Sequence, residues 1–317
     1  MSGIPSSSDQ ATQLRRLAAE QMIILADKLG LHSEDPFSLQ LAAADCNLAF
    51  YWIFDSQEKS RAECLSILAR FCTQYLPQLV DSIAQKYQYP ERYWSMKVEE
   101  FEKVYFHGYS QLKAMQALVV YCRPYAEKYL CMSNLGQRAE LVGGCALNLL
   151  LHETERAQHL MDGSLAPSIH LSDEIRAAVP KILSSFASVS DIVILILLHM
   201  SSEARRRCLS SAIVPRLRRV VQELLGWEVP VLDRASFISL FVLLQGRGDG
   251  LRPSSSMDEV HGLERCGRRD CAKTIENAQL FQCSRCGVVL YCSKRHQKED
   301  WQDSQRPHKA WCYKTPW

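Results

Sequence analysis

The sequence lacks a long hydrophobic run, and it lacks an excess of charge of either sign. No unbroken apolar stretch is longer than the seven residues of 192–198, whereas a helix that crosses a bilayer needs about 20. The 37 lysines and arginines nearly match the 35 aspartates and glutamates, so the formal net charge is only +2. We therefore expect a soluble protein without a membrane partner, and we expect no nucleic-acid partner.

The motifs of nucleotide binding and of catalysis are also missing. Neither a GxxxxGKS or GxxxxGKT loop nor GxGxxG occurs, so the common glycine-rich phosphate loops are absent. His152 and Glu153 begin like a helix-borne metalloprotease motif, but Arg156 stands where a second histidine is required. His159 lies on the same helical face, so a metal site there is the alternative to an ordinary solvated face. Because these motifs are missing, we expect a non-enzymatic protein. The alternative is an enzyme with its active site in the helical region.

The first ten residues, MSGIPSSSDQ, contain no basic region followed by an apolar one, so no secretory signal is visible. We expect a protein of the nucleus, the cytoplasm or both. In such a reducing compartment, clustered cysteines favour metal binding over disulfides. Seven of the 13 cysteines are scattered along apolar stripes and are interpreted as buried structural thiols: Cys46, Cys64, Cys72, Cys122, Cys131, Cys145 and Cys208.

The fold class expected from the sequence is mainly α. Residues 9–246 predict an all-helical domain, because helix caps and apolar stripes recur without a hairpin signal. A helix from about residue 57 is expected to break at Pro77, and Gly143-Gly144 marks a weak point or a close helix contact. Helix pairs over roughly forty residues suit an armadillo- or HEAT-like solenoid, and a compact irregular domain is equally compatible.

The domain boundaries follow from composition. Residues 1–8 are expected to form a disordered tail, and residues 247–260, rich in Gly, Pro and Ser, a linker to a small domain at 261–317. Two short basic stretches, 205–207 and 216–219, are interpreted as a solvated helix face, with an acidic partner or a targeting signal as the alternative.

The last fifty residues carry the strongest chemical signal of the chain. They hold the other six cysteines and two histidines, which are Cys266, Cys271, Cys283, Cys286, Cys292, His296, His308 and Cys312. Thiolates and imidazoles are the ligands of structural zinc, and eight of them are enough for two tetrahedral sites. We therefore expect two zinc ions per chain.

The spacing of these residues supports metal binding. Cys283 and Cys286, followed by Gly287, are typical of a zinc knuckle in which the glycine takes the left-handed conformation. Both Cys292-x3-His296 and His308-x3-Cys312 place two donors one helical turn apart, on the same face. The spacing of Cys266 and Cys271 also lies within the range seen for zinc ligands.

The segment from 266 to 312 resembles the MYND-type zinc finger. The resemblance rests on the ligand order together with Tyr291-Cys292, Gln297, Trp301 and the closing His308-Lys309-x-x-Cys312. It implies interleaved ligands, with Cys266, Cys271, Cys292 and His296 on one zinc and Cys283, Cys286, His308 and Cys312 on the other. The sequence departs from the family pattern in the four residues between the first two ligands and in His296, where a cysteine is usual. A RING-like cross-brace, which also interleaves its ligands, fits the closing motifs less well.

The resemblance also implies a function. MYND modules bind protein partners through short proline-containing peptides, and the matching positions here are Gln297 and Trp301. The strand-like residues 288–291 would offer an edge for backbone pairing, with Trp301 as an apolar platform; the alternative for Trp301 is a place in the core of the finger. Some MYND proteins are methyltransferases with a SET domain, but here the finger is C-terminal and no Asn-His-x-Cys-like motif precedes it. We therefore expect a zinc-binding adaptor.

Overall fold

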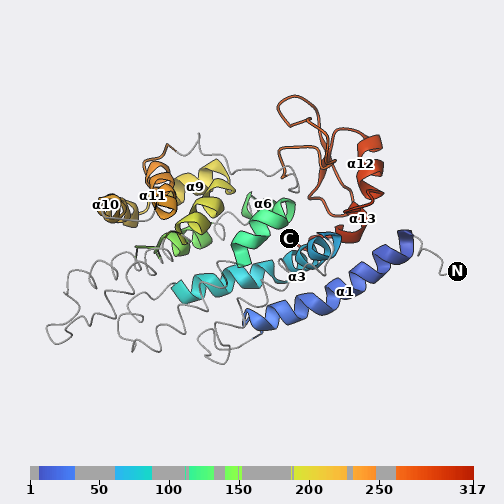
Figure 1. The fold of residues 1–317 in the computed structure, drawn as a ribbon, viewed down its shortest axis with the longest axis horizontal. Coiled ribbons are helices and arrows are strands. Elements are labelled where there is room, and N and C mark those ends of the chain that lie inside the picture. The colour runs from blue at the N-terminus through green and yellow to red at the C-terminus, as the bar shows by residue number, and fades with distance from the viewer. Residues whose placement is uncertain are drawn as a thin grey trace. The chain divides into compact units, whose positions relative to one another are not determined.

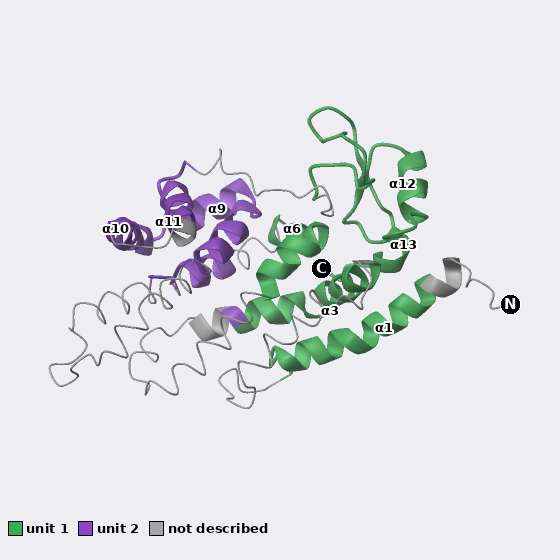
Figure 2. Cartoon of the chain, viewed as in Figure 1, with its two compact units in different colours: residues 1–82, 98–132, 255–317 green, residues 83–97, 133–254 purple. Residues whose placement is uncertain are grey.

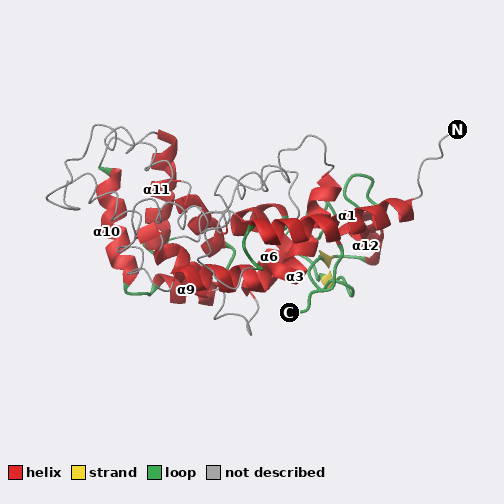
Figure 3. Cartoon of the chain, turned by 90° about the horizontal axis from the view of Figure 1, so that it is seen from below, coloured by secondary structure: helices red, strands yellow, loops and turns green. Residues whose placement is uncertain are grey.

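The computed structural model describes residues 7–32, 61–87, 111, 114–131, 140–148, 150–151, 187, 189–226, 231–247 and 262–317. This part of the chain is mainly helical, as predicted (Figure 1). Its only regular strands form a two-stranded sheet near the C-terminus (Figure 3). The solenoid arrangement stays a prediction, and the residues of the metalloprotease-like motif, 152–159, lie outside the described residues.

The chain divides into two compact units that do not follow the order of the sequence (Figure 2). Unit 1 combines Met1–Ser82, Val98–Met132 and Ser255–Trp317, so the C-terminal finger belongs to the same unit as the N-terminal helices. Unit 2 combines Ile83–Lys97 and Ser133–Ser254. Most of the expected linker, residues 248–260, lies outside the described residues.

The described helices of unit 1 are α1 (Ser7–Lys28), α3 (Arg61–Tyr87, whose last turn falls in unit 2) and α6 (Arg123–Cys131). Helix α1 begins two residues before the expected start. It ends before Gly30, whose positive φ of 66° lets Leu31 N donate back to Ala26 O at 3.0 Å. Residues 114–121 are also helical and precede α6.

The expected break at Pro77 is wrong, because α3 continues through it. An interior proline removes one backbone hydrogen bond and costs about 3 kcal/mol. The flanking side chains Leu76, Leu79 and Val80 are fully buried, and each such aliphatic side chain contributes about 2 kcal/mol. Burial along the helix therefore offsets the local cost of the proline.

Unit 2 is helical wherever the structure describes regular elements. It contains residues 140–148 and 189–198 together with α9 (Ser202–Leu209), α10 (Ile213–Leu225) and α11 (Val231–Leu244). The apolar stretch 192–198 is a buried helix, as expected, and within the described residues no helix has the length and apolarity to cross a bilayer.

Two local predictions can be checked in unit 2. A side chain at Gly143 would meet the Cys208 Sγ at 2.8 Å and the Met200 Cε at 2.9 Å, so this glycine marks a close helix contact, whereas Gly144 faces open space. Of the basic stretch 205–207, Arg206 and Arg207 form exposed ion pairs with Glu203, as expected of a solvated helix face.

The scattered cysteines are mostly buried thiols, as predicted. Cys72, Cys122, Cys145 and Cys208 are buried, but Cys64 is half-buried and Cys131 is exposed. Cys46 lies outside the described residues.

Candidate metal centres

The finger is built on a small sheet and two short helices. Strands β1 (Phe281–Gln282) and β2 (Leu290–Tyr291) pair antiparallel, and they are followed by α12 (Lys294–Trp301) and α13 (His308–Trp311). The turn between the strands is the expected knuckle: Gly287 N donates to Cys283 O at 2.8 Å, and Gly287 has a φ of 65°. This left-handed turn brings the thiols of Cys283 and Cys286 together.

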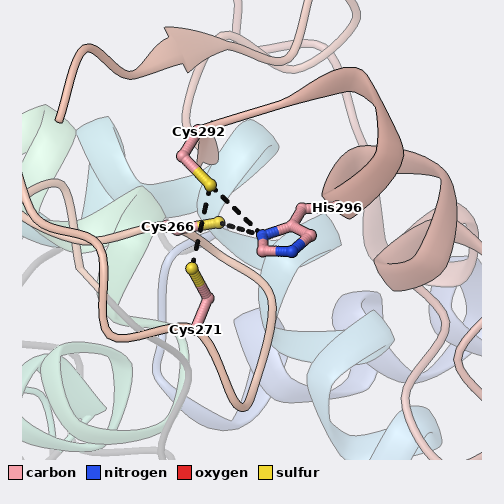
Figure 4. A group of neighbouring side chains, drawn as sticks. All are labelled: Cys266, Cys271, Cys292 and His296. Atoms are coloured by element: carbon pink, nitrogen blue, oxygen red, sulfur yellow. Dashed lines mark hydrogen bonds between the residues drawn. The ribbon is translucent and has the colours of Figure 1, made fainter.

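The structure brings the eight donor side chains into the two groups of four that the resemblance implied. Group 1 consists of Cys266, Cys271, Cys292 and His296, and Figure 4 shows its three sulfurs and the imidazole facing one another. Cys271 Sγ lies 3.8 Å from Cys292 Sγ, and His296 Nδ1 lies 3.7 Å from Cys266 Sγ and 3.2 Å from Cys292 Sγ. Ser293 places His296 in the first turn of α12, because its hydroxyl accepts a hydrogen bond from the His296 N–H at 3.2 Å.

Group 2 consists of Cys283, Cys286, His308 and Cys312. Cys283 Sγ lies 3.8 Å from Cys312 Sγ, and Cys286 Sγ lies 3.6 Å from His308 Nε2. The knuckle provides two of the donors, and α13 with the residue after it provides the other two. All four side chains are buried, whereas Cys292 and His296 of group 1 are half-buried.

The separations fit a tetrahedral zinc site. With Zn–S bonds of about 2.3 Å and Zn–N bonds of about 2.05 Å, a tetrahedral angle places two sulfurs about 3.8 Å apart and a sulfur and a nitrogen about 3.6 Å apart. The separations of 3.8 Å between sulfurs and of 3.6 and 3.7 Å between sulfur and nitrogen match these values, and the one from Cys292 Sγ to His296 Nδ1 is shorter, at 3.2 Å. Disulfide sulfurs would be only about 2.05 Å apart. Each group can therefore hold one zinc ion.

The four donors of group 2 share protons, and this shifts the pKa values of Cys283 and His308 in opposite directions. Hydrogen bonds from the Cys286 and Cys312 side chains lower the pKa of the Cys283 thiol. Burial lowers the pKa of His308, but its hydrogen bonds to Cys283 and Cys286 outweigh burial and raise the pKa to about 9. A zinc ion would replace the protons that these four groups share, because it binds thiolates and the neutral imidazole.

Aromatic rings enclose His308. The Trp311 ring lies 4.4 Å from the imidazole between centroids, the Trp301 ring 5.8 Å and the Tyr291 ring 6.1 Å, all roughly edge-on. Tyr291 in turn donates a hydrogen bond to the buried Asp300 carboxylate at 2.6 Å, and burial raises the pKa of Asp300. The imidazole orientation is thus fixed by packing on several sides.

The two residues predicted to bind a peptide, Gln297 and Trp301, lie one turn apart on α12 and are both half-buried. The Trp301 ring packs against His308 at 5.8 Å between centroids, so it contributes to the interior of the finger, and its peptide-binding role stays a prediction.

The expectation that residues 288–291 form an open edge is wrong. Leu290 pairs with Gln282 of β1 on one side and with Cys266 on the other, where Gly267 N donates to Leu290 O at 2.7 Å. The backbone groups of β2 are therefore already used. Within the described residues, the unpaired edge of the sheet belongs to β1.

Sequence reasoning missed the residues that hold group 2 from outside the finger. The segment that follows α13 contacts Arg15 of α1, Ser66 of α3 and Tyr125 of α6. These residues are separated from the finger by roughly 190 to 300 positions, as their sequence separations of 188, 247 and 297 show. No local spacing or motif marks such contacts.

Comparison with family models matches residues 264–312 to the MYND finger. The chain matches no curated protein and no solved structure. The matched residues begin two positions before Cys266 and end at Cys312, so they contain both donor groups. The C-terminal region of this chain is therefore a MYND finger, a zinc-binding protein-interaction domain with two groups of side chains that can each hold a zinc ion.

Proposed function

We propose that the protein is a non-enzymatic adaptor that binds a short peptide segment of a protein partner through its MYND finger. The observation that carries this proposal is the composition of the donor groups, since each contains four protein side chains. Four protein ligands complete a tetrahedral zinc site, whereas catalytic zinc keeps one position for water or substrate. The metal would then serve to hold the surface of the finger.

The peptide surface proposed here includes Gln297 and Trp301. Trp301 has one ring edge against the buried His308, so its orientation is set before a partner arrives. A fixed, half-exposed indole loses little conformational entropy on binding, and tryptophan is one of the residues that contribute most at interfaces. The neighbouring Gln297 offers an amide that can donate to and accept from a peptide backbone.

The outer edge of β1 is the second part of this surface. An extended peptide can add to an unpaired strand edge by backbone hydrogen bonds, while apolar or proline side chains rest on aromatic rings. Phe281 of β1 is 37% exposed and contacts Tyr291 at 6.2 Å between centroids. We infer that the partner is a short proline-containing segment. Because the finger needs free thiolates, the proposal places the protein in the nucleus or the cytoplasm, where thiols stay reduced.

The test uses the full-length, zinc-loaded protein and an array of proline-containing peptides. For the peptides that bind, Trp301→Ala should weaken affinity by about 30-fold, the size of a strong interface contribution. Gln302→Ala, at the exposed next position, is the matched control and should bind like wild type.

Zinc content is measured for every variant, because Trp301 also covers His308. A Trp301→Ala protein that keeps two zinc ions per chain and binds the peptides unchanged would show that the partner does not use this surface. Gln297→Ala, which leaves the rings around His308 in place, provides an independent reading of the same surface.

A further inference from the structure

Both ends of the finger are attached to helix α6. At the beginning, the Glu127 carboxylate accepts a hydrogen bond from Leu263 N at 2.9 Å. Arg123 lies between two carboxylates and pairs with Glu127 at 2.7 Å and with Glu264 at 3.0 Å. Glu127 is only 7% exposed, and a buried carboxylate with these partners is costly to separate from them. The first residues of the finger are therefore fixed to α6.

At the other end, Tyr125 of α6 holds the backbone on both sides of Cys312. Its fully buried hydroxyl accepts a hydrogen bond from Tyr313 N at 2.8 Å. The single proton of this hydroxyl is shared between two carbonyl acceptors, Trp311 O at 2.9 Å and Tyr313 O at 3.0 Å. One side chain of the helical region thus bonds to the residues immediately before and after a donor of group 2.

Helices α1 and α3 complete this arrangement. The Arg15 guanidinium donates to Lys309 O at 2.8 Å and to Cys312 O at 3.0 Å, and the Ser66 hydroxyl donates to Ala310 O at 2.9 Å. Together with the two carbonyls near Tyr125, five consecutive carbonyl oxygens, those of residues 309–313, lie within hydrogen-bond distance of side chains from three helices. Buried carbonyls that lose such partners carry a large desolvation cost.

The knuckle is linked to α6 as well. Lys128 donates to the Thr315 hydroxyl at 3.2 Å, and this hydroxyl donates to Cys286 O at 3.3 Å. Three thiolates and one zinc ion would carry one net negative charge, so the positive groups of Lys128 and Arg15 lie where they stabilise it. Side chains of the helices thus lie close to the knuckle donors of group 2 as well as to His308 and Cys312.

We propose that helices α1, α3 and α6 are part of the second metal site, that Tyr125 is its positioning residue, and that zinc in group 2 in turn keeps these helices together. The finger is then no detachable module. Loss of zinc from group 2 loosens helices that lie at the opposite end of the sequence. Loss of zinc from group 1 affects them less, because Leu263 and Glu264, which contact α6, precede the first donor of that group. Zinc in group 2 therefore controls the order of the helical part of unit 1.

The test measures how fast each cysteine becomes accessible in the full-length, zinc-loaded protein. The protein is exposed to EDTA and an alkylating reagent, and mass spectrometry follows each cysteine separately. Tyr125→Phe removes only the hydroxyl, and Tyr121→Phe, at a position that is 50% exposed, is the matched control. In Tyr125→Phe the three cysteines of group 2 should be alkylated about tenfold faster, because buried polar groups lose their partner. The cysteines of group 1 should keep the wild-type rate, as should all six in the control.

Two other outcomes overturn the proposal. If all six cysteines react faster by the same factor in Tyr125→Phe, the hydroxyl supports the finger in general; if none does, it supports neither group. Should Tyr125→Phe fail to fold, Ser66→Ala removes one hydroxyl that bonds Ala310 O and Tyr313 and gives the same test with a smaller expected change. Amide hydrogen exchange in α1 and α6 during zinc removal provides the reciprocal reading, and unchanged protection there would contradict the proposal.

Discussion

The two donor groups of the finger contain the same chemistry in different surroundings. Each has three cysteines and one histidine, but group 2 is entirely buried, whereas Cys292 and His296 of group 1 are half-buried. The ligand set decides which metal binds, and it is the same in both. The surroundings decide how easily water and competing ligands reach the metal. Two sites with one preference for zinc can therefore differ in the rate of metal loss and in what depends on the metal.

The difference follows from where the histidines lie. His296 is in the first turn of α12, whose neighbouring residues Lys294 and Arg295 are exposed. His308 begins α13, which contacts α1, and it is surrounded by the rings of Trp301, Trp311 and Tyr291. The first group thus stabilises the finger itself, and the second stabilises the finger together with the helices on which it rests.

The largest effect is expected from removing one ligand of each group. Cys312→Ser and Cys271→Ser should each leave one zinc ion per chain, as elemental analysis would show. Structural zinc contributes about 10–16 kcal/mol in finger peptides, which is comparable to the stability of about 5–15 kcal/mol of a whole domain. We expect Cys312→Ser to lose amide protection in α1 and α6, and Cys271→Ser to lose it only within the finger. If both variants lost amide protection in α1 and α6 equally, zinc in either group would stabilise the helices to the same extent.

A smaller effect is expected from one glycine beside each group. A Cβ at Gly267, next to Cys266, would lie 2.3 Å from Val289 Cγ1, a side chain that is 2% exposed. Gly267→Ala should therefore destabilise the zinc-loaded protein by about 3 kcal/mol, the upper range for overfilled cores. At Gly287, next to Cys286, the nearest atom is the flexible Lys128 Nζ at 3.0 Å, and only the left-handed backbone opposes a side chain, at about 1 kcal/mol.

Thermal unfolding in the presence of zinc measures both glycine variants. If Gly267→Ala were harmless, group 1 would be loosely packed as well as more exposed. If Gly267→Ala lowers the unfolding temperature more than a substitution at Gly287 does, the half-buried ligands of group 1 rest on a tightly packed interior.

Spacing in the sequence was sufficient to predict the eight donors and the turn at Gly287, and the resemblance to the MYND-type finger implied the division of the donors into two groups. These features depend on residues within one turn or one knuckle, or on a ligand order shared with a family. Three features were not predictable in this way. The helix α3 continues through Pro77 because the side chains on either side of it are buried. Strand β2 pairs with Cys266 on the side opposite β1. The contacts of Tyr125 with residues 311–313 join segments far apart in the sequence. The local sequence pattern of one segment does not indicate that it contacts the other.

The smallest expected effect compares one arginine near each group. Arg70 of α3 lies over the Tyr313 ring at 5.3 Å, and Tyr313 is 6% exposed. Arg70→Ala should lower the unfolding free energy of the zinc-loaded protein by about 1 kcal/mol, the size of a partly desolvated cation–π contact. Arg295, near group 1, pairs with Glu299 at 2.8 Å, but its side chain is 85% exposed. Because solvent and salt screen such a pair, Arg295→Ala should leave the denaturation midpoint unchanged. A larger loss for Arg295→Ala than for Arg70→Ala would mean that the surface of α12, rather than the contact with the helices, supports the metal sites.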